Sequence, residues 1–253
     1  MSRTGATPSG RARRLFVEHA LAEGARIELG AEQLHYVRDV VRLRDGDEVL
    51  VFNGRDGEWS ARVEVARRAA RLTVVSLTRA QEKPCDLHFL FAPLKHARLD
   101  YMAQKATELG VSRLQPVITA RTGVGRVNVR RMRANAIEAA EQCGLTSVPE
   151  VDAPLPLEKL IAGWPAERRL VFADEAAGAG RDFTALADLR GLPVALIVGP
   201  EGGFTAGERE LLRGLSAATA ISLGPRVMRA DTAAVAALAL VQALAGDWTV
   251  ANG

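Results

Sequence analysis

Two apolar runs, each followed by a loop containing glycine and proline, lie in the carboxyl-terminal third of the chain. The first is Val194-Ala195-Leu196-Ile197-Val198-Gly199-Pro200-Glu201-Gly202-Gly203-Phe204, and the second is Ala218-Thr219-Ala220-Ile221-Ser222-Leu223-Gly224-Pro225-Arg226-Val227-Met228-Arg229. Short apolar runs bounded by turn residues are typical of buried strands. We therefore expect both loops at the carboxyl edge of one parallel sheet, which is where α/β sheets bind ligands.

Strand-like and helix-like patterns alternate around these two runs. Apolar runs predict strands, and residues recurring at helical spacing predict helices. The further strands are expected over 87–92, 114–118 and 170–173, and the helices over 99–109, 129–142 and 231–244 with one more from Thr205. Such alternation predicts an α/β domain whose mostly parallel sheet is covered by helices on both faces.

The preceding part of the chain has a β-type pattern. Alternating apolar residues predict strands over 14–17, 48–52, 59–65 and 72–76, with turn residues at 53–57. One helix is expected over 31–41, where Leu34, Val37, Val40 and Val41 recur. Residues 80–84 have linker composition. We therefore expect a disordered tail over 1–12, a small β-rich domain over 13–80 and the α/β domain over 81–253.

Composition limits the classes of protein that the chain can represent. Its 253 residues are enough for a full core, and a net charge of +3 permits an anionic partner without requiring one. The two cysteines, Cys85 and Cys143, have no zinc-site spacing and fit a reducing cytoplasm. The longest uncharged stretch, 232–246, is shorter than the roughly 20 residues of a membrane span. We expect a cytoplasmic protein without a membrane segment.

The first loop matches none of the common phosphate-binding or hydrolytic motifs. It lacks the G-x-G-x-x-G dinucleotide pattern, no G-K-[ST] follows it, and the chain has no G-x-S-x-G elbow. Its backbone carries few side chains and can approach a flat ligand closely, although a loop shaped only for turning remains the alternative. Thr205 is a candidate helix cap with Glu208 three residues later.

The second loop carries a candidate anion or carbonyl holder. Arg226 and Arg229 stand on either side of the apolar pair Val227-Met228. Arg229 is the candidate, because a cation beside a cleft formed by glycines can hold an anion or a carbonyl group. Asp231 and Thr232 then open a helix, where capping alone is the alternative explanation for both. The four histidines have no metal-ligand spacing, so no metal is expected.

Basic residues gather at three further places in the chain. Such clusters can contact RNA phosphates, although a solvated helix face explains them equally well. They are Arg13 and Arg14; Lys95, Arg98 and Lys105; and Arg121 with Arg126, Arg130, Arg131 and Arg133.

Motifs along nearly the whole chain resemble those of one known family, the bacterial small-subunit ribosomal RNA uridine N3-methyltransferases. This family is a branch of the SPOUT methyltransferases. The matching pieces, in order, are Arg13-Arg14-Leu15-Phe16-Val17, Leu34-His35-Tyr36-Val37-Arg38, Arg44-Asp45-Gly46-Asp47, Lys105-Ala106-Thr107-Glu108-Leu109-Gly110-Val111, Glu138-Ala139-Ala140-Glu141-Gln142 and the two loops.

The resemblance implies a fold and an activity that periodicity cannot reveal. It implies a PUA-like β-barrel domain followed by a SPOUT domain with a trefoil knot, a rare exception to chain topology. It further implies a homodimer that binds S-adenosylmethionine and methylates N3 of one uridine, the 1498-type position, in 16S rRNA of the small ribosomal subunit. A SPOUT enzyme acting on tRNA or a ribose 2′-oxygen, and a non-catalytic RNA-binding protein, are the alternatives.

The resemblance also assigns candidate site residues. Arg229 is expected to stabilise charge on the uridine carbonyls, with Glu201 or Asp231 as the candidate base. The cofactor-binding candidates are Val198, Gly199, Pro200, Glu201, Gly202, Gly203, Leu223, Gly224, Val227, Met228 and Thr232. The RNA-binding candidates are Arg13, Arg14, Arg38, Lys95, Lys105 and Arg121.

Two positions depart from the family pattern. The family usually has an arginine shortly after the Glu-Gln pair, whereas Leu145 stands in this region here. The last helix opens with Asp231-Thr232-Ala233 where Glu-Thr-Ala is more usual, which shortens the reach of the carboxylate.

Overall fold

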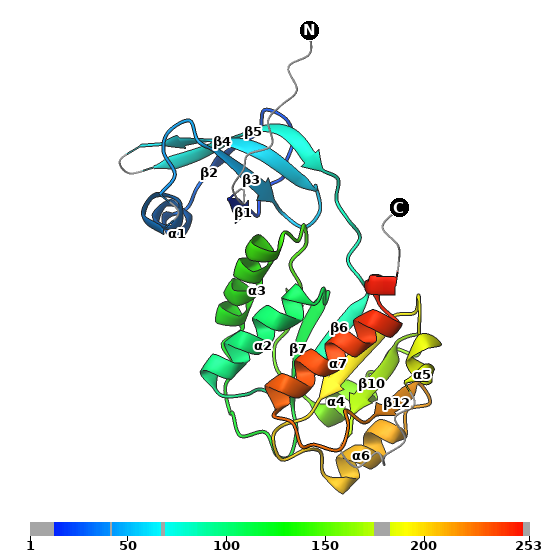
Figure 1. Ribbon diagram of the computed structural model, residues 1–253. Helices are drawn as coiled ribbons and strands as arrows, with labels where there is room; N and C mark the ends of the chain where they lie inside the picture. Colours follow the sequence, from blue (N-terminus) through cyan, green and yellow to red (C-terminus); the bar gives the residue numbers. More distant parts are fainter. Residues whose placement is uncertain (1–12, 41, 67–68, 175–182, 250–253) are drawn as a thin grey trace. The chain divides into compact units, whose positions relative to one another are not determined.

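The computed structural model describes residues 13–40, 42–66, 69–174 and 183–249 (Figure 1). These residues form two compact units: the first contains those up to Lys83 together with Ala140–Val148, and the second contains Pro84–Ala139 and those from Pro149 onward. Residues 140–148 belong to the first unit, so a single boundary near residue 80 does not describe the division completely. The tail predicted over 1–12 lies outside the described residues.

The first unit is built on a five-stranded sheet. Its strands lie in the order β1-β3-β4-β5-β2, with β1 parallel to β3 and the other neighbours antiparallel. They are β1 (Arg14–Phe16), β2 (Arg26–Glu28), β3 (Glu48–Phe52), β4 (Glu58–Val65) and β5 (Ala70–Arg79). The predicted alternation along β4 is confirmed over 61–64, because Ala61 and Val63 are buried while Arg62 and Glu64 are exposed. Ser60, predicted on the outward face, is buried instead, where the pairing with β5 shifts register. The short β2 was not predicted.

The helix predicted over 31–41 has a different form. Helix α1 (Ala31–His35) continues as a π-helical turn over Tyr36–Val40. The wider π turn adds a residue per hydrogen-bonded ring, so residues three apart no longer share a face. Val37 is therefore buried while Val40, expected on the same apolar face, is 60% exposed. That part of the helix prediction is wrong.

The second unit is built on a parallel sheet, as predicted. Its strands lie in the order β12-β10-β11-β6-β7-β8, with β9 also paired to β7. The strands are β6 (Leu87–Phe91), β7 (Arg113–Ile118), β8 (Glu150–Val151), β9 (Leu155–Pro156), β10 (Arg169–Ala173), β11 (Val194–Val198) and β12 (Ala218–Ile221). The helices are α2 (His96–Glu108), α3 (Val129–Cys143), α4 (Leu157–Ala162), α5 (Thr184–Ala187), α6 (Ala206–Arg213) and α7 (Ala230–Leu244), with a 3-10 turn over Asp247–Thr249.

Helices cover both faces of this sheet. Leu157 and Ile161 of α4 and Leu212 of α6 pack in one core with Ala195 and Ile197 of β11. The alternate residues of β11 point to the opposite face, and α7 packs there beside α2 (Figure 1). None of the described helices is long and apolar enough to cross a membrane.

Three neighbouring strands end at one edge of the sheet. β12, β10 and β11 are parallel and adjacent, so the segments that follow Ile221, Ala173 and Val198 leave the sheet on the same side. This confirms the prediction that the two glycine- and proline-bearing loops share a carboxyl edge. The helix α4 and the short strands β8 and β9 were not predicted, because their runs are too brief to show a period.

Candidate functional site

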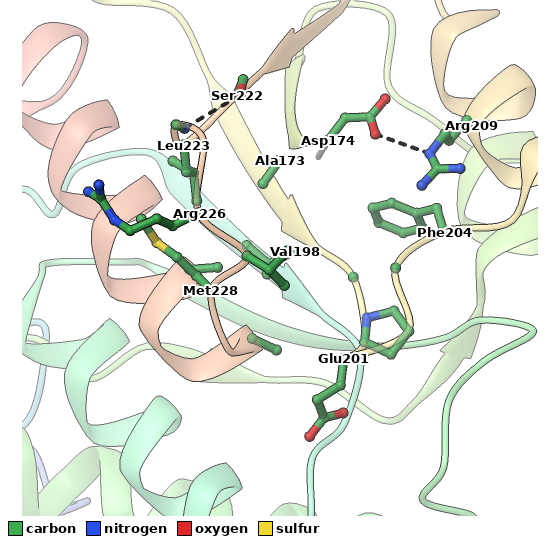
Figure 2. A pocket seen from close by; sticks show the side chains of 17 residues that line it. Ala173, Asp174, Val198, Glu201, Phe204, Arg209, Ser222, Leu223, Arg226 and Met228 are labelled. Carbon is green, nitrogen blue, oxygen red and sulfur yellow. Dashed lines mark hydrogen bonds and ion pairs between the residues drawn. The ribbon is translucent and has the colours of Figure 1, made fainter. Parts of the chain in front are cut away.

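A cleft opens between the loop that follows β11 and the loop that follows β12. In Figure 2, Asp174, Phe204 and Arg209 lie on one side, Leu223, Arg226 and Met228 lie on the other, and Val198 lies between them. The cavity between these walls has a volume of about 90 Å³, within about 650 Å³ of space that includes open solvent. The carboxyl edge of the sheet therefore carries an open cleft, which is where parallel α/β sheets bind ligands.

Close packing holds the first loop in a narrow turn. The Gly203 amide donates to the Pro200 carbonyl at 2.8 Å, and Gly203 has a φ of 66°, which favours glycine. A Cβ on Gly199 would lie 3.1 Å from the Phe204 ring, and the Arg121 guanidinium donates to the Gly202 carbonyl. The loop backbone is thus packed from one side and faces the cleft with few side chains.

A capping box anchors this loop to helix α6. The Thr205 hydroxyl accepts from the Glu208 amide at 3.3 Å, and the Glu208 carboxylate accepts from the Thr205 amide at 2.7 Å. The same carboxylate accepts from the Ala120 amide at 2.7 Å. Burial raises the pKa of Glu208, but these hydrogen bonds outweigh it and hold the pKa below its usual value. The predicted roles of Thr205 and Glu208 in capping are confirmed.

A buried carboxylate forms part of the cleft wall. The Asp174 side chain is 1% exposed and pairs with Arg209 Nε at 3.0 Å and Arg213 Nη2 at 2.7 Å. These ion pairs join the end of β10 to helix α6. Sequence reasoning missed this cluster, because the partners lie more than thirty residues apart and no local motif links them.

The second loop presents an apolar tip beside the cleft. Gly224 has a φ of 108°, a conformation that other residues rarely adopt, and the Val227 side chain is 88% exposed. Met228 lines the cleft, and helix α7 begins two residues later at Ala230. The loop therefore ends directly in the amino-terminal turn of α7.

Of the three candidate catalytic residues, Glu201 lines the cleft, whereas Arg229 and Asp231 lie at the start of α7 and do not line it. Arg229 lies between Met228 and Ala230, which both line the cleft, and none of the described residues pairs with its guanidinium. Arg98 of α2 lies 3.2 Å from the Glu201 carboxylate and 4.0 Å from the Asp231 carboxylate. The Glu201 side chain points away from Val198 and Met228 (Figure 2). Arg98 thus links both carboxylates.

The structure places most of the candidate cofactor residues along the cleft. Val198, Gly199, Pro200, Glu201, Gly203, Leu223, Gly224, Val227 and Met228 line it. Gly202 does not, because it faces Arg121, and Thr232 is exposed on α7 without lining the cleft. Lining residues that sequence reasoning missed are Ala173, Asp174, Phe204, Arg209, Ser222, Arg226, Ala230 and Ala233.

The candidate RNA-binding residues have different surroundings. Arg13 and Lys95 are exposed, Arg38 pairs with Asp39 at 2.8 Å, and Lys105 pairs with Glu108 at 2.7 Å. Arg121 supports the first loop through the Gly202 carbonyl.

Arg14 has a structural role instead. Its side chain is 8% exposed, pairs with Glu58 at 2.6 Å, and donates to the Ala140 and Leu145 carbonyls at 2.7 and 2.8 Å. The guanidinium also lies over the Phe52 ring. This burial contradicts the prediction that Arg14 contacts RNA, because its donors are directed to groups within the first unit. No group of described His, Cys, Asp or Glu residues is arranged to hold a metal ion.

Comparisons with known proteins assign a class to this fold and cleft. The RNA methyltransferase domain family matches residues 81–242, and the RNA methyltransferase PUA domain family matches residues 29–75. A methyltransferase from Legionella pneumophila, solved with bound SAM, aligns with a TM-score of 0.83 and 30% identity over 94% of this chain and 100% of its own. A small-subunit ribosomal RNA methyltransferase E from Neisseria gonorrhoeae, bound to S-adenosyl methionine, aligns with a TM-score of 0.82 and 27% identity over the same shares.

The fold, the cleft and these matches therefore define an RNA methyltransferase in which a PUA domain precedes an α/β methyltransferase domain. The ribosomal RNA small subunit methyltransferase E of Rickettsia conorii is 30% identical over 234 residues, which are 91% of this chain and 95% of that protein. The Bacillus subtilis protein of the same name is 27% identical over 246 residues. The chain belongs to the ribosomal RNA small subunit methyltransferase E family.

Proposed function

We propose that this protein transfers a methyl group from S-adenosylmethionine to N3 of one uridine in 16S rRNA of the small ribosomal subunit. The observation that supports this proposal most is the cleft between the two loops. Next to its lining residue Met228 stands Arg229, whose side chain has no ion-pair partner among the described residues. Relatives named as small-subunit rRNA methyltransferases support the class of substrate. The reaction would take place in the cytoplasm.

The residues of the cleft fit S-adenosylmethionine. The Gly199–Gly203 backbone can approach a flat adenine, because a side chain at Gly199 would meet the Phe204 ring. Val198, Leu223 and Met228 supply apolar walls for the ligand. The cofactor, when bound, supplies an electrophilic methyl group on a sulfonium.

Positioning is expected to provide most of the rate enhancement. The sulfonium charge disappears as the methyl group is transferred, so a desolvated anion against it would stabilise the ground state more than the transition state. A rigid loop that orients both reactants avoids this cost. The packing of Gly199 on Phe204 and the Glu208 capping box give the first loop that rigidity.

Loss of the N3 proton leaves negative charge on the uridine carbonyl oxygens. Arg229 would stabilise this charge, and its exposed guanidinium, which has no partner among the described residues, supports that role. Glu201 or Asp231 accepts the proton, and Arg98 holds both carboxylates near the amino terminus of α7. The target uridine must be unstacked from the RNA to reach this site.

We also propose that the enzyme acts as a homodimer. From the sequence, Val235, Leu238 and Val241 on one face of the last helix could contribute to a dimer contact or pack on their own sheet. Leu238 and Val241 are 1% exposed and pack within their own unit, while Val235 is half-buried. Exposed apolar residues are therefore better candidates for that contact. Light scattering on purified protein will give the mass of the assembly.

The substrate assignment is tested by methyl transfer from labelled S-adenosylmethionine to small subunits from cells lacking this enzyme. Large subunits, tRNA and already methylated small subunits serve as controls. We expect label only in 16S rRNA of the unmethylated small subunits. Label in tRNA would contradict the substrate, and saturable cofactor binding without transfer to any RNA would indicate a binding protein.

A further inference from the structure

A second cavity lies wholly within the first unit, and none of its lining residues is assigned to methyl transfer. It lies between the sheet strands β1, β3, β4 and β5 and the 140–148 segment that packs with them. Its volume is about 580 Å³, within the range of about 300–1,000 Å³ typical of small-molecule sites. Nothing in the proposed methyl transfer uses this cavity.

The cavity is lined by three arginines, Arg13, Arg14 and Arg79, and by two carboxylates, Glu58 and Glu141, so the charge of the lining favours an anion. Arg79 also lies 3.8 Å from the carboxylates of Glu58 and Glu82. Glu58 is already neutralised by Arg14 at 2.6 Å. Arg79 donates through Nη2 to the Gly144 carbonyl, while its buried Nε has no hydrogen-bond partner among the described atoms. Arg13 lines the cavity with an exposed side chain that no described residue pairs. The exposed Arg13 guanidinium is thus available to bind a phosphate oxygen through charge-assisted hydrogen bonds.

The rest of the lining suits a nucleobase. Tyr36 presents a half-buried aromatic ring, and its hydroxyl donates to Glu141 at 3.5 Å. Gln142 presents an exposed amide that can both donate and accept. Proteins recognise single-stranded RNA by stacking unpaired bases on aromatic rings and bonding their polar edges, with arginines on the phosphates.

We propose that this cavity binds one unstacked nucleotide of the substrate RNA, distinct from the nucleotide that is methylated. Its phosphate lies against Arg13 and Arg79, and its base lies against Tyr36 and Gln142. The inference rests on the proposed function, because the nucleotide belongs to the rRNA substrate. The cavity thereby anchors the RNA at a point remote in sequence from the two cofactor loops.

Binding of the full-length variants to unmethylated small subunits tests the phosphate contact. Arg13→Ala removes an exposed side chain, so it should fold normally and weaken binding about tenfold. It should also lower the slope of log affinity against log salt by about one. Arg26→Ala, an exposed arginine on β2 outside the cavity, is the matched control and should leave affinity and slope unchanged. Equal affinities for Arg13→Ala and Arg26→Ala would overturn the proposal.

A thiol footprint tests whether RNA occupies the cavity itself. Cys143 is exposed at its rim, whereas burial raises the pKa of the Cys85 thiol and slows its reaction. In a Cys85→Ser background, small subunits should slow alkylation of Cys143 at least fivefold, and this protection should be lost in Arg13→Ala at the same subunit concentration. Unchanged alkylation under saturating subunits would overturn the proposal. Protection by free uridine monophosphate but not by subunits would also overturn it, in favour of a free-nucleotide site.

The two proposals fail in different ways. Label found on another nucleotide or atom would contradict the proposed function, yet Cys143 protection by that RNA would still support the cavity. Methylation at N3 of the expected uridine, with no protection of Cys143 from alkylation, would contradict only the cavity proposal. The Arg79→Lys variant adds a further check, since it keeps the charge but removes the planar guanidinium that can bind a phosphate through two nitrogens. Weaker binding of this variant to small subunits, with an unchanged thermal unfolding temperature, would support a nucleotide site in the cavity. Binding as tight as that of the unmodified protein would contradict it.

Discussion

Arg229 is the residue on which the proposed chemistry depends most. It precedes α7 at the end of the cleft, and no described residue neutralises it. Because the uridine acquires charge only during the reaction, Arg229→Ala should lower kcat about 100-fold or more while changing cofactor affinity less than about twofold. Single-turnover kinetics and calorimetric titration of S-adenosylmethionine measure the two effects, with Arg26→Ala as an exposed control. A parallel loss of rate and cofactor affinity would assign Arg229 to cofactor binding instead.

His88 predicts a pH dependence of stability. Burial lowers the pKa of His88 to about 4, and Arg168 and Arg113 lower it further than Asp86, at 3.5 Å, can raise it. The unfolded chain, with a histidine pKa of about 6.5, therefore binds a proton that the folded chain does not. The contribution of His88 to stability is present above about pH 6.5 and is lost as the pH falls toward about 4. Urea unfolding should show a smaller loss between about pH 7 and pH 5 for His88→Gln than for the unmodified protein, and identical losses would contradict this account.

At the level of elements, helix α6 and its cap connect stability to the cofactor site. Thr205→Ala removes the hydroxyl of the capping box and should reduce the free energy of unfolding by about 1 kcal/mol. The same change frees Phe204, which packs on Gly199, so cofactor affinity should also fall. Thr205→Ser keeps the hydroxyl and is the control, with denaturant unfolding and cofactor titration as the measurements. Equal behaviour of the alanine and serine variants would show that the capping box is unimportant.

Elements with a strong local signal could be predicted from the sequence, and those set by distant contacts could not. The β11 run and the Thr205–Glu208 cap are encoded within a few residues, and both were predicted. The π-helical turn at Tyr36–Val40 was missed because apolar spacing alone does not distinguish it from an α-helix. The Asp174 ion pairs and the Arg98 bridge were missed because they join residues far apart in the chain.

The candidate site was only partly predictable for a related reason. Both loops were recognised because glycine and proline mark turns after apolar runs. Their meeting at one cleft follows from the strand order β12-β10-β11, which periodicity does not specify. Arg14 looked like an RNA contact in the sequence, and only the fold places Glu58 and the Ala140 and Leu145 carbonyls around it.

At the scale of the whole molecule, two units with different tasks share one chain. The net charge of only +3 gives a weak general attraction to RNA, so binding depends on contacts between individual arginines and RNA phosphates. The first unit offers Arg13 and Arg79 at its cavity, and the second unit carries the cleft between the two loops. We therefore propose that the first unit binds the RNA and that the second unit transfers the methyl group.

Identification of the methylated atom tests this account most directly. Small subunits lacking the modification are incubated with the enzyme and S-adenosylmethionine, and the 16S rRNA is digested to nucleosides for mass spectrometry against synthetic standards. The account predicts N3-methyluridine at a single site, formed at least about 100-fold more slowly when Arg229→Ala replaces the unmodified enzyme. A 2′-O-methylated nucleoside, or a methyl group on a base other than uridine, would contradict it.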